Sequence, residues 1–369
     1  MGERRIRIGV IGAGTFAEEA HIPGIQAHRQ GEVAALCARN QPRAAAMAAR
    51  LGVPDVYTDY HELLARPDIE AVTIATPDVL HAPIALAALA AGKHVFCEKP
   101  LAMTVAQAEQ MVAVAARADR IAMVGFTFRY TRALQTLRRL LGEGALGTPF
   151  HVSLHVHWGA IGYPGPALGW ADHADQAAAG AWGDAAPHLF DALAYILAPV
   201  REVCAQMMIV SRDERRPQPD SVDIAMCLAR LHLPGYDDPP SDVSAFADRE
   251  RGHVQATLFA SRVDQPYRVG DEIQVVGTRG AASCALSRGA HERLSLCRVG
   301  TPWEDLPLGD DATTEAPLAL SRMMGAFIDA VIRGHLDREQ DPSFADGLRA
   351  QRAIEAAVRS ARAGRWEAL

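Results

Sequence analysis

The stretch IRIGVIGAGTFA, residues 6–17, decides how the rest of the chain is interpreted. Apolar side chains over residues 6–11 predict a buried strand, and residues 12–17 predict a glycine-rich turn that leads into a helix. Glycines at such a turn let the backbone approach a pyrophosphate, and the N–H groups at the helix start favour its negative charge. Ala17 stands where the third glycine of this fingerprint usually lies, which is a permitted variant. Taken alone the pattern is weak, because such turns also occur without a ligand.

The composition narrows the class of protein. With 369 residues the chain is long enough for about two domains, and its 49% of apolar residues can form a large core. A net charge of -7 and a pI near 6.1 argue against a general nucleic-acid or membrane-surface binder. The six cysteines include no Cys-x-x-Cys pair, and no apolar run approaches the ~20 residues that span a bilayer. We therefore expect a soluble cytoplasmic protein with free thiols.

Strands and helices alternate in the first third of the sequence. Apolar runs predict further strands at residues 33–37, 71–75, 94–97 and 121–124. The alternation implies right-handed crossovers and a doubly wound parallel sheet, so we assign residues 1–126 to a Rossmann domain that binds a dinucleotide. The segments that should meet at the carboxyl edge of this sheet are the glycine turn, Ala38-Arg39, Thr76-Pro77 and Glu98-Lys99-Pro100.

The end of the second strand favours NADP over NAD. An NAD site usually places a carboxylate there, where it binds the ribose 2′-OH. Here the sequence reads Leu36-Cys37-Ala38-Arg39-Asn40, without a carboxylate, and the Arg39 guanidinium suits a 2′-phosphate. The alternative is that Arg39 stacks on the adenine or lies in solvent, in which case either cofactor would bind.

The second half of the sequence has a different pattern. Strand-like runs follow one another without intervening helices at residues 150–158, 203–210, 222–233, 254–260 and 272–276. We therefore predict an α+β domain with a large open, mostly antiparallel sheet over residues 127–369, with helices at 321–332 and 344–363. A Pro-rich polar loop over residues 234–252 is either an ordinary surface insertion or an arm that reaches the cleft of a neighbouring subunit.

Three histidines alternate along one predicted strand. His151, His155 and His157 fall on the same face because side chains repeat with period two. A metal site is disfavoured because no fourth ligand is evident, so we expect no metal and favour contacts in a pocket or against another subunit. The aromatic and polar loop that follows contains Trp158 and Trp170, and its composition suits a polyol or sugar ring.

Several motifs occur in a characteristic order. They are Gly12-x-Gly14-x-x-Ala17, Thr76-Pro77 with His81, Gly92-Lys93-His94-Val95, Glu98-Lys99-Pro100-Leu101-Ala102 and Gly125-Phe126-x-Phe128-Arg129-Tyr130. Together they resemble the Gfo/Idh/MocA oxidoreductase family, typified by glucose–fructose oxidoreductase and inositol dehydrogenase. A further match runs from Gly180 through Asp184 and His188 to Asp191, and it resembles the family's Gly-Gly-Gly…Asp-x-Gly-x-His-x-x-Asp segment. This match departs from the family at three glycines, where the chain has Ala181, Trp182 and Ala186.

The resemblance implies that Lys99, Asp184 and His188 form the catalytic group of a nicotinamide-dependent enzyme. In that chemistry a base takes the hydroxyl proton and a cation stabilises the developing oxyanion. A histidine ordinarily titrates near neutral pH, which suits His188 as the base, and Lys99 supplies positive charge. Asp184 shares a helix face with His188 if a helix starts nearby. The alternatives are that Asp184 caps a helix and that His188 is a surface histidine.

The candidate contacts fall into two groups. The expected cofactor contacts are Gly12, Gly14, Thr15, Phe16, Ala17, Ala38, Arg39, Thr76, Pro77, His81, Glu98 and Lys99. The expected substrate contacts are Arg129, Trp158, Trp170, Asp184, His188 and Asp191. For His81 a structural role in the turn before a helix is the alternative.

The leading hypothesis is an NADP- or NAD-dependent enzyme that transfers a hydride between the nicotinamide and a sugar, cyclitol or related carbinol or carbonyl compound. Two other classes stay open, namely a glycosidase that oxidises its sugar transiently with bound NAD, and a non-catalytic dinucleotide-binding regulator. The resemblance also implies a homodimer or homotetramer that assembles through the open face of the C-terminal sheet. We expect no nucleic-acid or membrane partner.

Overall fold

The computed structural model describes residues 4–157, 175, 179–210, 222–233, 253–263, 270–286, 292–309 and 317–369. The chain divides into two compact units. The first takes in Met1–Tyr130, Asp175–Ala178 and Pro317–Gln351, and the second takes in Thr131–Ala174, Ala179–Ala316 and Arg352–Leu369. The expected domain boundary at residue 127 stays a prediction. A C-terminal segment, however, joins the first unit.

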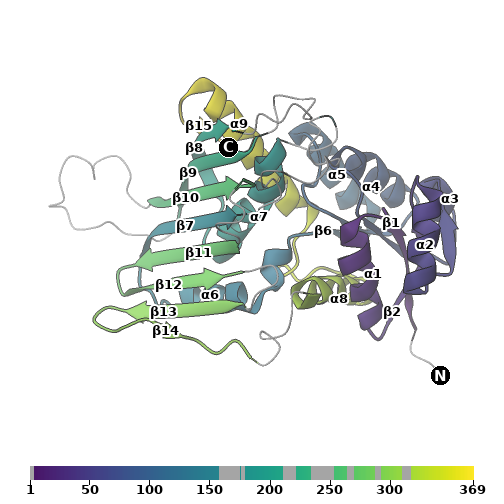
Figure 1. Cartoon of the computed structure of the whole chain (residues 1–369), viewed down its shortest axis with the longest axis horizontal. Helices are drawn as coiled ribbons and strands as arrows, with labels where there is room; N and C mark the ends of the chain where they lie inside the picture. The colour runs from purple at the N-terminus through teal and green to yellow at the C-terminus, as the bar shows by residue number, and fades with distance from the viewer. Residues whose placement is uncertain are drawn as a thin grey trace. The chain divides into compact units, whose positions relative to one another are not determined.

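A parallel sheet of six strands, all within residues 4–157, forms the centre of the first unit (Figure 1). The strands are β1 (Ile6–Ile11), β2 (Gly31–Cys37), β3 (Asp55–Tyr57), β4 (Ala71–Ile74), β5 (His94–Cys97) and β6 (Ala122–Val124). Their order is β3-β2-β1-β4-β5-β6, and each of these pairings is parallel. The strand order reverses between β1 and β4, which is where such sheets bind ligands. The predicted doubly wound sheet is confirmed.

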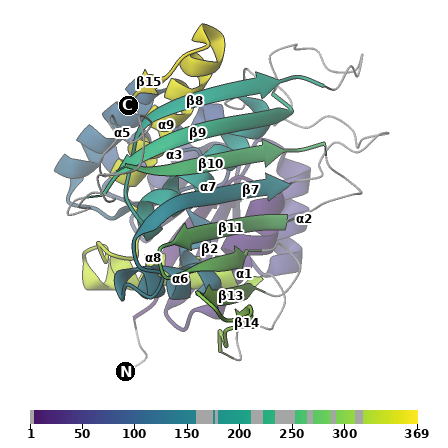
Figure 2. The same cartoon turned by 90° about the vertical axis from the view of Figure 1, so that its left-hand side faces the viewer.

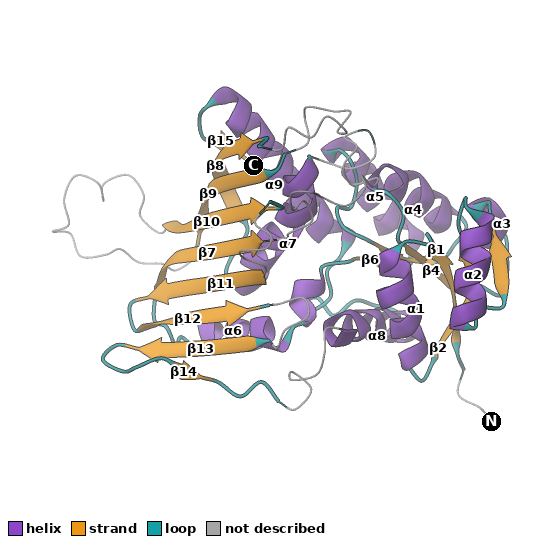
Figure 3. Ribbon diagram, in the orientation of Figure 1, coloured by secondary structure: helices purple, strands orange, loops and turns teal. Residues whose placement is uncertain are grey.

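Helices and short helical turns connect the strands (Figure 3). The helices are α1 (Ile22–Ala27), α2 (Gln41–Leu51), α3 (Tyr60–Leu64), α4 (His81–Ala90) and α5 (Val105–Ala118), and the short turns are η1 (Ala17–His21), η2 (Asp78–Leu80) and η3 (Thr127–Tyr130). Capping residues define the ends of several of these helices. The Asn40 side chain accepts the Arg43 N–H at 3.1 Å at the start of α2, and Gly52 ends that helix with φ +68°.

Helix α8 (Pro317–Arg333) packs within the first unit, although most residues of the second unit precede it in the sequence. A Cβ on Gly24 of α1 would lie only 2.8 Å from the Met324 Cγ, so α1 and α8 are in close contact. The Phe327 ring is fully buried, with its centroid 5.7 Å from that of Phe96 on β5. Burial of such apolar side chains is the reason that α8 joins this core.

The second unit contains a sheet of nine strands in the described part of the chain. They are β7 (Pro149–His157), β8 (Val200–Met208), β9 (Ile224–His232), β10 (His253–Ser261), β11 (Gly270–Gly277), β12 (Gly280–Ala285), β13 (Arg293–Arg298), β14 (Glu304–Asp305) and β15 (Glu367–Ala368). Their order is β14-β13-β12-β11-β7-β10-β9-β8-β15. The β7–β10 pair is parallel and the other pairs are antiparallel, which confirms the prediction of an open, mostly antiparallel sheet.

The two faces of this sheet differ. The helices α6 (Arg132–Gly142) and α7 (Gly180–Ile196) pack against one face, whereas Figure 2 shows the strands of the other face with no helix in front of them. Along β7 the side chains alternate, with Val152 and Leu154 fully buried and His151 and His155 half-buried on the opposite face. A last helix, α9 (Phe344–Ala363), begins in the first unit and ends in the second.

Two features concern the chain more widely. All six cysteines are free thiols, and burial raises the pKa of those of Cys97, Cys227 and Cys284. These thiols therefore stay protonated and unreactive at neutral pH.

Among the described helices, none combines the length and the hydropathy needed to cross a bilayer.

Candidate active site

The glycine-rich turn lies where β1, β2 and β4 end. The Gly12 N–H donates to the Cys37 carbonyl oxygen at 2.8 Å, which joins the turn to the end of β2. A Cβ on Gly12 would fall 2.1 Å from the Ala75 carbonyl oxygen, and φ of Gly12 is +116°, so glycine is required. A Cβ on Gly14 would meet no atom within 4 Å. The turn is therefore packed tightly on its inner side and open at Gly14.

The helical segment after the turn starts with Thr15 and Phe16 and continues as a π-helix. Its residues form η1 (Ala17–His21), in which the Ile22 N–H donates to the Ala17 carbonyl oxygen five residues earlier. Pro23 lies in the first turn of α1, where its missing N–H is tolerated, so it does not break the segment. In this geometry His21 is directed into the interior and is fully buried.

The end of β2 presents a cation. Arg39 is exposed, and its guanidinium makes no ion pair or hydrogen bond with the described residues. Burial, followed by the charges of Asp59 and Glu62, raises the pKa of the Cys37 thiol to about 11. The carboxylates near the end of β2 are therefore those of Asp59 and Glu62, which follow β3. The sequence of β2 alone did not indicate them. Ala38 is half-buried beside Arg39.

His81 ties together the segments that follow β4 and β5. It is buried, with Nδ1 2.7 Å from the Pro100 carbonyl oxygen and Nε2 3.0 Å from the Thr76 carbonyl oxygen. Both ring nitrogens therefore bind backbone carbonyl groups. This agrees with the alternative that His81 has a structural role in the turn before a helix. Its expected contact with a cofactor stays a prediction, as does that of Pro77, which precedes η2.

Glu98 and Lys99 follow β5, and both are buried. The Glu98 Oε1 lies 3.0 Å from Nε2 of His21, and Oε2 accepts the Lys99 N–H at 3.2 Å. A Cβ on Gly125 would lie 3.0 Å from the Glu98 carboxylate, so this glycine leaves room for it. His21 is the residue of this site that sequence analysis missed. The feature that could have indicated His21 is an ionisable residue at a position where the helical segment faces the protein interior.

The chain has two lysines among its 37 basic residues, Lys93 and Lys99. The Lys93 Nζ donates to the carbonyl oxygens of Arg66 at 2.7 Å and Ile69 at 2.8 Å. Burial lowers the pKa of Lys93, and attraction by Asp68 partly opposes that shift. Lys93 therefore stabilises backbone, and Lys99 is the lysine at the carboxyl edge of the sheet.

In the second unit, Asp184, His188 and Asp191 all lie on α7. Their spacings of four and three residues place them along one side of the helix, as predicted. The helix begins at Gly180 with Ala179 as its N-cap, so the alternative of Asp184 as the N-cap is wrong. His188 is 2% exposed, so the alternative of a surface histidine is also wrong, while Asp184 is exposed.

The residues that replace the family's glycines, Ala181, Trp182 and Ala186, all lie within α7. Trp182, which stands in place of a glycine, is fully buried and lies edge-on to Phe190 with 5.7 Å between ring centroids. Pro187 lies within the helix, which continues to Ile196. The segment is therefore helical from Gly180 onward.

The uncovered face of the nine-stranded sheet has an apolar hollow of about 520 Å³. Its lining includes His155, His157, Cys204, Met226, Leu228 and Phe259. The Phe259 ring centroid lies 5.9 Å from that of His155 and 5.1 Å from that of His157, so the imidazoles pack on an aromatic ring. In the described parts of the chain, no three histidine, cysteine or carboxylate side chains form a metal-binding group.

Arg129, predicted as a substrate contact, is buried and paired. Its Nη2 donates to the Asp346 Oδ1 at 3.0 Å, and Asp346 also accepts the Ser343 N–H and hydroxyl, each at 2.7 Å. Burial by itself raises the Asp346 pKa, but the charges of Arg129 and Arg349 and the bonds from Ser343 outweigh it and lower that pKa. The substrate contact of Arg129 stays a prediction. Trp158 and Trp170, like residues 234–252, lie outside the described residues.

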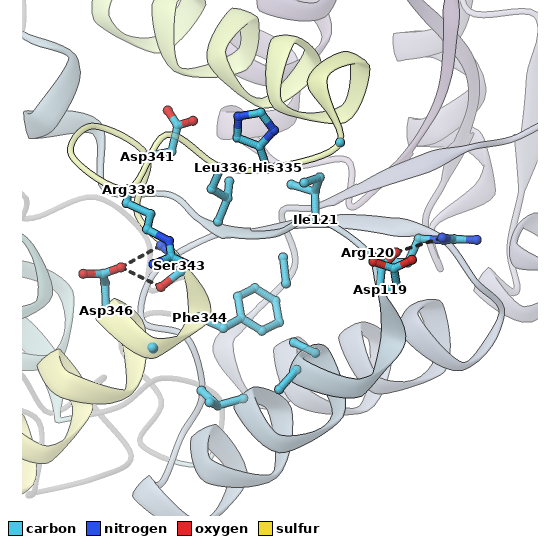
Figure 4. Close-up of a pocket in the computed structure, with 16 residues that line it drawn as sticks. Asp119, Arg120, Ile121, His335, Leu336, Arg338, Asp341, Ser343, Phe344 and Asp346 are labelled. Atoms are coloured by element: carbon cyan, nitrogen blue, oxygen red, sulfur yellow. Dashed lines mark hydrogen bonds between the residues drawn. The ribbon is translucent and has the colours of Figure 1, made fainter.

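A second hollow of about 520 Å³ lies at the amino end of β6 (Figure 4). It is lined by α5, by the turn after α8 and by the first residues of α9. Two of its carboxylates are engaged, since Asp346 accepts from Ser343, and Asp341 accepts from the Tyr130 hydroxyl and from Arg333, each at 3.0 Å. The hollow lies at the opposite edge of the sheet from the glycine turn, so it is distinct from the edge at which a dinucleotide is expected to bind.

Two family profiles match the chain. Residues 6–126 match the oxidoreductase family profile described as an NAD-binding Rossmann fold, and residues 134–283 match the GFO/IDH/MocA C-terminal domain. The chain belongs to the Gfo/Idh/MocA oxidoreductase family. The resemblance drawn from the motifs is confirmed.

Two curated proteins and one crystal structure illustrate what this chain is similar to. The chain is 34% identical over 229 residues to levoglucosan dehydrogenase of Pseudarthrobacter phenanthrenivorans, which covers 60% of this chain and 57% of that enzyme. The chain thus spans little more than half the length of this and similar curated relatives. It is 29% identical over 362 residues to inositol 2-dehydrogenase of Acidothermus cellulolyticus, covering 98% and 94% of the two chains. The crystal structure of an oxidoreductase domain protein from Kribbella flavida superposes with a TM-score of 0.86 over 99% of both chains at 26% identity.

The Arg129–Asp346 pair predicts a pH-dependent stability. Because the folded pKa of Asp346 lies below its unfolded value of about 3.9, its stabilisation is present at neutral pH and is lost as the pH falls through the folded pKa. Asp346→Asn should therefore lower the free energy of unfolding by about 3 kcal/mol at pH 7 and by less below about pH 4. Urea denaturation at several pH values measures this difference. Asp119→Asn, at an exposed position, is the control, and a deficit that stays constant with pH contradicts the assignment.

Proposed function

We propose that this protein is an NADP(H)- or NAD(H)-dependent oxidoreductase. It transfers a hydride between the nicotinamide and a carbinol or carbonyl carbon of a sugar, a cyclitol or a related small molecule. The observation that carries the proposal is the shared carboxyl edge, where the glycine turn, Glu98 and Lys99 all follow strands of one parallel sheet. The relatives named as levoglucosan and inositol dehydrogenases support the substrate class.

The residues at this edge fit a dinucleotide. The backbone at Gly12 is packed against Ala75 and the turn is open at Gly14, which suits the close approach of a pyrophosphate. The N–H groups at the start of the following helical segment, from Thr15 to Ala17, complement its charge. The Thr76 hydroxyl oxygen is buried without a hydrogen-bond partner among the described residues, so it is available to a bound group. When bound, the cofactor supplies the hydride acceptor or donor.

The chain's own groups handle the proton and the charge. The Lys99 ammonium binds the reacting oxygen of the substrate and stabilises negative charge as it develops there. His188 takes the proton from that oxygen during oxidation and returns it during reduction. Asp184, one turn earlier on α7, orients the substrate or the imidazole, and Asp191 contacts the substrate. The residue types and the family resemblance support these roles.

The cofactor preference is for NADP. The exposed Arg39 guanidinium, which has no partner among the described residues, is placed just after β2, where a 2′-phosphate binds in such folds. Charge-assisted hydrogen bonds from a guanidinium to a phosphate are strong because both geometry and charge match.

The open sheet face is proposed to form the interface of a homodimer or homotetramer. Apolar side chains on neighbouring strands of this face are half exposed, namely Met208, Met226 and Leu228 at 44%, 46% and 48%. Burial of such a patch against a second copy would remove it from water. We also propose a cytoplasmic location, which the six free thiols support because disulfides do not persist in a reducing compartment.

Lys99→Met and His188→Gln should each lower kcat by about 10²- to 10⁴-fold, because each removes a group that acts at the reacting oxygen. The measurement is nicotinamide absorbance with polyols, aldoses and keto-sugars and with both cofactors. His335→Gln, at an exposed histidine, is the control. Unchanged turnover in both variants contradicts the proposal, and cleavage of a glycoside without net cofactor reduction supports the glycosidase alternative instead.

Arg39→Asp should weaken NADPH binding by roughly 10- to 100-fold, since a hydrogen bond to a charged group contributes about 1.5–3 kcal/mol. NADH binding should change far less. Fluorescence titration of both cofactors measures the difference, with the exposed Arg117→Asp on α5 as the control. Equal effects on the two cofactors would rule out the 2′-phosphate role.

Leu228→Glu should dissociate the oligomer, because it places a charge in the apolar hollow of the open face. Light scattering coupled to size-exclusion chromatography measures the mass. Val299→Glu is the matched control, since Val299 is 76% exposed in the turn after β13. A wild-type monomer, or a variant with the wild-type oligomeric mass, contradicts the interface.

A further inference from the structure

The contact between His21 and Glu98 is a buried polar pair that the proposed chemistry does not use. His21 is 0% exposed and Glu98 is 6% exposed, and Nε2 lies 3.0 Å from Oε1. The two residues are 77 positions apart, on the segment after the glycine turn and the segment after β5. Since a buried polar group without a partner is costly, each of these side chains restricts where the other can lie.

Both oxygens of the Glu98 carboxylate are engaged. One is bound to His21, and the other accepts the backbone N–H of Lys99 at 3.2 Å. The absence of a side chain at Gly125, where a Cβ would lie 3.0 Å from the carboxylate, leaves the space that this arrangement needs. The carboxylate therefore bridges the His21 ring and the backbone that carries the Lys99 side chain.

The His21 ring is itself held in place. It lies edge-on to Phe96, with 5.3 Å between ring centroids and an interplanar angle of 88°, and Phe96 packs in turn on Phe327. The π-helical turn that ends at His21 follows directly after the glycine turn, and such turns recur at functional sites. A ring fixed by Phe96, on the segment that follows the glycine turn, thus contacts the carboxylate of the residue before Lys99.

We propose that His21 is a positioning residue for Lys99. Through Glu98 it fixes the backbone from which the Lys99 side chain projects, and so holds the ammonium where the oxyanion develops. The kinetic consequence rests on the proposed function of Lys99. A role in packing alone would instead lower stability without changing the Lys99 backbone or the turnover of the folded enzyme.

The scarcity of lysine allows a direct test on the full chain. Protein labelled with ¹⁵N in lysine alone gives two lysine backbone amide resonances, from Lys93 and Lys99. His21→Leu should shift the Lys99 amide resonance, because its acceptor is no longer fixed, and leave that of Lys93, which donates to Ala88 at 3.0 Å, in place. His21→Gln, which keeps an N–H donor, should restore the Lys99 resonance. A Lys99 resonance that His21→Leu leaves unchanged overturns the proposal.

Kinetics provide the second readout. His21→Leu should lower kcat by about 10²-fold, since a catalytic group displaced by about 1 Å loses that much. In a Glu98→Gln background the same substitution should have little further effect, because the two residues act as one unit. His28→Leu, which removes a histidine 3.3 Å from Asp329 in the same unit, is the matched control and should keep kcat. Equal losses from His21→Leu in both backgrounds indicate packing alone and contradict the proposal.

The two proposals fail separately. If the wild type transfers no hydride with any substrate or cofactor of the panel, the proposed function is wrong, and the lysine resonances still decide the role of His21. If the wild type is active and His21→Leu has the wild-type kcat, the positioning role is wrong and the proposed function stands.

Discussion

The backbone at Gly12 passes so close to the Ala75 carbonyl that no side chain fits between them, and the first unit depends on this contact. The Gly12 N–H binds the Cys37 carbonyl, and the Ala75 N–H binds the Ile11 carbonyl, so the ends of β1, β2 and β4 form one hydrogen-bonded edge. The His81 ring then connects the segment after β4 to the segment after β5. Because these links are short and buried, the functional segments share one rigid frame.

Buried ionisable side chains fix loops at both edges of the same sheet by binding backbone. Lys93 donates to two carbonyl groups, and Glu98 accepts the N–H of its neighbour while also contacting His21. A buried charge is stable only when its hydrogen-bonding capacity is used, so each of these contacts fixes a loop as well as a side chain. Lys99 thereby projects from backbone that is fixed by hydrogen bonds, as its proposed role at the reacting oxygen requires.

The two faces of the sheet in the second unit differ in what covers them. One face carries α7, on which His188 and Asp191 are buried while Asp184 remains exposed. The other face has no covering helix, and it exposes Met226 and Leu228 around an apolar hollow. Successive side chains of a strand point to opposite faces, and in this sheet apolar side chains lie on both, so covering one face with helices leaves apolar surface exposed on the other.

The sequence by itself determined the strand–helix alternation, the glycine turn, the helical spacing of Asp184 and His188, and the family, because these depend on neighbours within a few residues. Only the tertiary structure decided that α8 belongs to the first unit, that His21 pairs with Glu98, and that Arg129 pairs with Asp346. The paired residues are 77 and 217 positions apart, so no local pattern encodes their contact. The partner of a buried polar group is set by which segments the apolar core brings together, and that choice is made by packing of the whole chain.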